Sequence, residues 1–165
     1  MRKIKNTVLI SKIKTRNRIK KKNPKMAVCI TMYNENESEL KDTLAGVIHN
    51  YNELRNEEEL DFKKEDFVVF LICDGYERIP KSFKDYATQK HFFDLDLLIA
   101  KGFMEQDRDK NWKMKDMRDL MEQGVDPKKV PTNIIHMFQV STWDFGLDSD
   151  ILKGRRINFV FAIKQ

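Results

Sequence analysis

The sequence has little of what a disulfide framework or a membrane span requires. It holds two cysteines, six glycines and four prolines in 165 residues. Cys29 and Cys73 each lie in an apolar run and not in a paired Cys-x-x-Cys spacing, which argues against a disulfide or zinc framework. The longest uninterrupted apolar run, Phe67 to Cys73, has seven residues, whereas a transmembrane helix needs roughly 20. The sequence therefore predicts no transmembrane helix and, by default, an intracellular compartment.

Acidic residues are missing from the first 25 residues, which hold eleven Lys or Arg. The rest of the chain therefore holds 20 basic and 26 acidic residues, a net charge of −6 within an overall +5. Because the positive excess belongs to this segment alone, we expect no nucleic-acid partner. The division that we predict is a basic N-terminal extension, residues 1–25, followed by one domain, residues 26–165.

Several catalytic and cofactor signatures are also missing. The chain has no Gly-x-Ser-x-Gly and no Cys/His pairing for nucleophilic catalysis. His49, His91 and His136 lack metal-ligand spacing, so each is predicted to be structural. No Gly-x-Gly-x-x-Gly follows the first predicted strand, although a dinucleotide-binding turn needs it to bring the backbone close to the pyrophosphate. Recognition of a base and a sugar remains open.

The chain is organised around residues 26–37, which read M-A-V-C-I-T-M-Y-N-E-N-E. An apolar run with β-branched residues predicts a strand, and the capping-box spacing of Asn36 and Glu39 predicts that a helix follows. This is the opening half of a βαβ unit, and α/β sheets bind ligands beyond the carboxyl ends of their strands. We therefore expect Tyr33, Asn34 and Glu35 to face a site.

A second polar group follows the next predicted strand, residues 67–73, which ends at Asp74-Gly75. If the two strands are neighbours, Asp74 lies near Tyr33. Carboxylates can accept hydrogen bonds from an imide N–H or from ribose hydroxyls, and a tyrosine ring can stack on a base. The alternative is that Asp74-Gly75 simply makes a turn after a buried strand.

The remaining segments are predicted as scaffold. Residues 81–106 are expected to be partly helical with an end near Gly102, and residues 107–129 to contain a helix on Met114, Met117, Leu120 and Met121. Two further strands are predicted at residues 133–140 and 157–163, the last as an interior type of strand left with an exposed edge. Asp94-Leu95-Asp96 resembles a metal-binding Asp-x-Asp pair, but its place in a helix-like stretch favours a solvated helix face.

Four segments resemble the first half of chitin synthase in order and spacing. They are V-C-I-T-M-Y-N-E at 28–35, L-I-C-D-G at 71–75, I-I-H-M-F-Q-V-S-T at 134–142 and N-F-V-F-A-I-K at 158–164. Chitin synthases are membrane-bound, inverting family 2 glycosyltransferases that add N-acetylglucosamine from its UDP donor to a growing β-1,4 chain. The resemblance implies an α/β fold, a partial GT-A (Rossmann-like) domain with a mostly parallel sheet flanked by helices.

The resemblance also implies roles for individual residues. Thr31, Tyr33 and Glu35 would line a uridine pocket, Asp74 would hold the uracil, and Lys164 would approach the nucleotide. The family uses Mg²⁺ or Mn²⁺, but its metal-binding acidic motif, catalytic base and acceptor motif match nothing in this chain. No catalytic or metal residue is therefore assigned, and we expect the isolated chain to be inactive.

The partners that the resemblance implies are UDP-N-acetylglucosamine and the remainder of the synthase or its membrane domain, at the cytosolic face of the plasma membrane. The chain is then either a fragment or a short protein that retains donor recognition. The alternative from another class is a non-catalytic nucleotide-binding or regulatory module whose basic extension binds anionic lipid or RNA.

Overall fold

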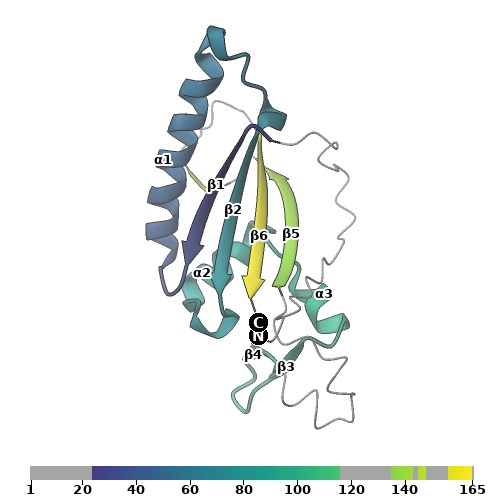
Figure 1. The fold of residues 1–165 in the computed structure, drawn as a ribbon. Coiled ribbons are helices and arrows are strands. Elements are labelled where there is room, and N and C mark those ends of the chain that lie inside the picture. The colour runs from purple at the N-terminus through teal and green to yellow at the C-terminus, as the bar shows by residue number, and fades with distance from the viewer. Residues whose placement is uncertain (1–23, 116–134, 143–144, 148–155, 165) are drawn as a thin grey trace, which may run out of the picture.

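A four-stranded sheet forms the centre of the molecule (Figure 1). The computed structural model describes residues 24–115, 135–142, 145–147 and 156–164. The strands are β1 (Met26–Met32), β2 (Phe67–Asp74), β5 (Ile135–Thr142) and β6 (Ile157–Lys164). Their order is β1-β2-β6-β5, with β1, β2 and β6 parallel and β5 antiparallel to β6. The predicted α/β class with a mostly parallel sheet is confirmed.

Helices flank the sheet, and a small hairpin lies near its carboxyl edge (Figure 1). The helices are α1 (Glu37–Asn56), α2 (Lys81–Gln89) and α3 (Leu95–Ala100), and the hairpin is β3 (Met104–Gln106) with β4 (Trp112–Met114). Three short 3₁₀ turns are η1 (Glu58–Leu60), η2 (Lys64–Asp66) and η3 (Tyr76–Arg78). Among the described residues, no helix is both long enough and apolar enough to cross a membrane.

The first βα unit forms for local reasons that the sequence displays. The Asn36 side chain accepts hydrogen bonds from the backbone N–H groups of Ser38 and Glu39, at 2.8 and 3.1 Å, and the Glu39 carboxylate accepts the Asn36 N–H at 2.8 Å. This reciprocal pair satisfies donors that the first turn of a helix otherwise leaves free. The capping box predicted from the sequence is confirmed, and it fixes where α1 begins.

The main core lies on one face of the sheet. Side chains alternate between the two faces of a strand, and the buried residues Ile30 and Met32 of β1 lie on the same face as Leu71 and Cys73 of β2. Buried residues of α1 and α2 join the same core cluster. Phe92 packs against Phe159 with ring centroids 4.8 Å apart.

Two predictions about elements need correction. The strand at the carboxyl end of the chain, β6, is not an edge strand, because it lies between β2 and β5. Met114 lies in a strand and not in a helix; residues 116–134, which carry the rest of that predicted helix, lie outside the described residues. The prediction that residues 81–106 are partly helical is confirmed: they contain α2 and α3, and Gly102 follows α3 with φ +74°, which agrees with the predicted end.

Candidate functional site

The carboxyl ends of three parallel strands meet at one edge of the sheet (Figure 1). Tyr33 directly follows β1, while Asp74 and Lys164 end β2 and β6 and are partners in the strand register. Thr31 is paired with Ile72, two residues before Asp74, so the side chains of Thr31, Asp74 and Lys164 lie on the same face. The sequence predicted this convergence for Tyr33 and Asp74.

Asp74 lies between two cations at this edge. Lys164 Nζ is 3.0 Å from Asp74 Oδ1, and Arg78 Nη1 is 3.5 Å from Asp74 Oδ2. The hydrogen bond and the charge of Lys164, with a smaller effect of Arg78, hold the pKa of the Asp74 carboxyl below its ordinary value. The side chain is half exposed, and a carboxylate offers about four lone-pair positions. Asp74 is thus an ionised acceptor with room for a further donor.

Tyr33 lies beside one of these two cations, Arg78. The guanidinium carbon of Arg78 is 4.7 Å from the centroid of the Tyr33 ring, a cation–π contact. Half of the Tyr33 side chain remains exposed to solvent. Arg78 therefore joins the aromatic ring to the carboxylate. Sequence analysis missed this residue, although its position four residues after Asp74 is a usable signal.

Glu35 shapes the loop that carries Tyr33. Its carboxylate accepts the backbone N–H groups of Tyr33 and Asn34, the latter at 3.1 Å. The backbone hydrogen bonds, that of Tyr33 first, lower the pKa of the Glu35 carboxyl. The negative charge of Glu35 adds to burial in raising the pKa of the Cys73 thiol, so Glu35 lies close to the end of β2. In this structure Glu35 holds the loop, and Asn34 is exposed.

The Asp74-Gly75 pair makes a turn as well as contributing to the cluster. Gly75 has φ +97° and leads into η3, which carries Arg78. Only glycine adopts such a φ at little cost. The turn interpretation and the binding interpretation of this dipeptide are therefore compatible, because the turn brings Arg78 back over Asp74.

Two of the other candidates from the sequence, Asp94 and His136, have structural roles. Asp94 caps α3 by accepting the Leu97 N–H at 2.8 Å, and Asp96 is exposed in the first turn. The buried His136 ring packs against Phe103 at 4.6 Å. Within the described residues, no three His, Cys, Asp or Glu side chains are grouped so that they could hold a metal ion. The residues present at the strand ends therefore do not fit the divalent ion of the family.

The fold and the strand-end cluster define a mixed α/β domain consistent with part of a GT-A-like fold. Two comparisons agree with this class. Residues 26–105 match the model of a chitin synthase-like glycosyltransferase domain. Chitin synthase 1 of Phytophthora sojae is 30% identical over 46% of this chain, and the match spans 9% of that protein's length. The predicted resemblance to chitin synthase is thereby confirmed for this segment.

Proposed function

We propose that this segment, together with β6, recognises the nucleotide of UDP-N-acetylglucosamine for a chitin synthase-like glycosyltransferase. In that enzyme the sugar would be transferred to a growing β-1,4 chain. The observation that carries the proposal is Asp74, an ionised acceptor that lies beside an exposed aromatic ring at the strand ends. The match to the glycosyltransferase model covers both residues.

Each side chain of the cluster has a role in this proposal. The Asp74 carboxylate accepts the imide N–H of uracil, and the Tyr33 ring stacks on the base. Lys164, whose side chain is half exposed, approaches the nucleotide as a cation, and Thr31 offers a hydroxyl on the same face. Glu35 keeps the loop in place through its backbone hydrogen bonds and would line the proposed uridine pocket with these residues.

The proposal assigns no step to a metal ion. The family's Mg²⁺ or Mn²⁺ stabilises a departing diphosphate, whereas the contacts proposed here for Asp74 and Tyr33 are to the base. Binding of UDP is therefore expected to change little when magnesium is added. Transfer itself would take place with the remainder of a synthase and its membrane domain as partners, on the cytosolic side of the plasma membrane.

Calorimetry with UDP and CDP tests the proposal. We expect UDP to bind more tightly than CDP, because N3 of uracil donates a hydrogen bond whereas N3 of cytosine accepts one. Asp74→Ala should remove this preference, and Tyr33→Ala should weaken both nucleotides alike. Asp85→Ala, which removes an exposed acid on α2, is the matched control and should behave like the unaltered chain. Equal affinities in all four proteins would exclude the proposed pocket.

A further inference from the structure

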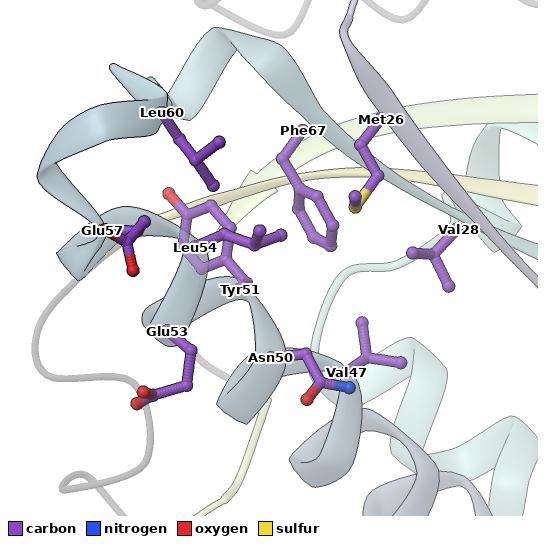
Figure 2. Close-up of a pocket in the computed structure, with 10 residues that line it drawn as sticks. All are labelled: Met26, Val28, Val47, Asn50, Tyr51, Glu53, Leu54, Glu57, Leu60 and Phe67. Atoms are coloured by element: carbon purple, nitrogen blue, oxygen red, sulfur yellow. The ribbon is translucent and has the colours of Figure 1, made fainter.

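An apolar groove lies at the opposite end of the sheet from the strand-end cluster. Figure 2 shows its lining, which comes from the start of β1, the end of α1, η1 and the start of β2. The groove has a volume of about 560 Å³. Its apolar walls include Met26 and Leu60, which leave 38% and 49% of their surfaces exposed, as well as Leu54 and Phe67. Exposure of large apolar groups at one place is typical of a docking surface.

The rim of the groove is acidic. Glu53 and Glu57 both line it (Figure 2). They are four residues apart at the carboxyl end of α1, a spacing at which like charges repel. The negative end of the helix dipole disfavours them further. Arg55, the basic residue of the last turn, donates to the Phe62 carbonyl at 2.9 Å. A positively charged occupant would relieve this repulsion.

The chain itself brings basic residues to this end of the molecule. Lys25 Nζ is 3.0 Å from the carboxylate of Asp66, whose side chain is 2% exposed, and it also donates to the Asp61 carbonyl at 3.2 Å. Lys25 directly precedes Met26, which lines the groove. Residues 1–23 therefore join the described chain beside the acidic rim.

The composition of residues 1–23 complements that surface. The segment has many Lys and Arg and no acidic residue, and it carries the aliphatic residues Val8, Leu9, Ile10 and Ile13 with Lys12 and Lys14 among them. Ten residues separate Ile13 from Pro24. At roughly 3.3 Å per extended residue this is enough chain to turn back to the groove.

We propose that residues 1–23 dock in this groove of the same chain, with the aliphatic residues of 8–13 against the apolar walls and the neighbouring lysines over the two rim carboxylates. In this arrangement the basic segment binds the surface at the carboxyl end of α1 within its own chain. This docking does not depend on nucleotide binding, which is proposed for the other edge of the sheet.

Paramagnetic broadening in the full chain tests the docking. A nitroxide is attached at Ser11→Cys in a Cys29→Ser background; the remaining thiol, Cys73, is buried. We expect the amide signals of Val28, Leu54 and Leu60 to lose at least about half of their intensity. The signals of residues 81–89, at the other end of the sheet, should stay unchanged. Raising the salt from 0.1 to 1 M shortens the screening length from about 10 to 3 Å and should reverse much of the broadening.

Two charge-reversal variants distinguish docking at this groove from a non-specific attraction between the basic segment and the acidic surface of the domain. Glu53→Lys with Glu57→Lys should abolish the broadening. Asp42→Lys with Asp85→Lys makes the same change in net charge on exposed positions away from the groove and should leave the broadening intact. Equal loss in both pairs, or uniform broadening of all amides, overturns the proposal.

The same label identifies the occupant. A nitroxide-labelled chain at natural isotope abundance is mixed with a ¹⁵N-labelled chain that carries no nitroxide. Docking within one chain predicts no broadening in this mixture. Broadening of the groove signals in the mixture would instead assign the groove to a second copy and overturn the proposal. The salt titration of the chain with intact rim residues keeps the test valid even if the reversed variant does not fold.

Discussion

Asp74 forms ion pairs with Lys164 and Arg78, and we also propose that it binds the nucleotide. Both roles require the ionised carboxylate. Lys164 lowers the pKa of this carboxyl mainly through a hydrogen bond and, to a smaller extent, through its charge. A carboxyl with a lowered pKa contributes stability above the unfolded-state value, and the contribution is lost as the pH falls through the folded-state value. Because Asp74 is half exposed, this contribution is screened by solvent and small.

The first prediction concerns the pH dependence of UDP binding. Since Asp74 stays ionised above the ordinary aspartate pKa of about 3.9, we predict a constant UDP affinity from about pH 8 to about pH 5. Calorimetry across this range checks it. The Asp74→Asn variant should bind UDP about tenfold more weakly, as expected when a hydrogen bond loses its charged partner. Its urea midpoint should stay close to that of the unaltered chain. A midpoint that falls together with the affinity would assign Asp74 a structural role only.

The two cysteines differ in environment. Burial, with a smaller contribution from the Glu35 charge, raises the pKa of the Cys73 thiol to about 12, whereas Cys29 is exposed. Because the thiolate is the reactive form, we predict that one thiol per chain reacts with a maleimide at neutral pH. The second should react only after unfolding. Cys29→Ser should remove the fast reaction, which mass spectrometry of the labelled chain would detect. Fast labelling of Cys73 in that variant would mean that β2 opens readily.

At the scale of elements, the N-cap of α1 links local sequence to the site. Asn36 ends the loop that carries Tyr33, and its side chain holds two backbone N–H groups of the first turn. We predict that Asn36→Ala lowers the free energy of unfolding by about 1 kcal/mol, measured by urea denaturation. Asn36→Asp preserves an acceptor at the same position and should be nearly neutral. Equal effects of both variants would show that the cap contributes nothing specific.

The elements also show what sequence patterns can and cannot predict. Strand, loop and capped helix at 26–56 were predictable because each is encoded by neighbouring residues. The apolar pattern of β6 indicated an interior strand, but its position between β2 and β5 was not predictable, since strand order depends on pairings between distant segments. Met114 looked helical because it precedes other methionines at helical spacing. Instead, the Asp107 carboxylate accepts the N–H groups of Asp109 and Asn111 and forms a turn. Strand β4, which contains Met114, follows this turn.

The candidate site was likewise predictable only where it depends on neighbouring residues or on simple strand pairing. Tyr33 and Asp74 follow apolar strands, and parallel pairing brings strand ends together. Arg78 was missed because its approach to Tyr33 depends on Gly75 and η3, a change of direction that composition alone does not specify. The positive φ of Gly75 is a property of the backbone that becomes visible only in three dimensions.

At the scale of the whole molecule, the proposed nucleotide site and the acidic groove lie at opposite ends of one sheet and one helix. α1 begins at Glu37, shortly after Tyr33 in the sequence, and its carboxyl end lines the groove (Figure 2). The two sites share no residue, but β1, β2 and α1 each run from one to the other, so occupation of one can influence the other through these elements and their packing. Whether a change at the groove affects the proposed nucleotide site therefore depends on how cooperatively the core between them unfolds.

Phe92 is the residue that tests this cooperativity. It is fully buried after α2, and its ring contacts Tyr86, Phe145, Phe159 and Phe161. We predict that Phe92→Ala lowers the free energy of unfolding by about 3–5 kcal/mol, a large part of the roughly 5–15 kcal/mol of a typical domain. Urea denaturation followed by circular dichroism measures the loss.

The control is Phe62→Ala, because Phe62 is partly buried at the end near the groove and its ring contacts Phe67 alone among the described aromatic rings. Its truncation should cost less, since fewer neighbours lose contacts. If the sheet and its helices form one cooperative unit, Phe92→Ala should shift the loss of helix signal and the loss of UDP binding to the same lower urea concentration. Separate transitions for the two signals would mean that the strand-end site is held by local structure and not by the shared core.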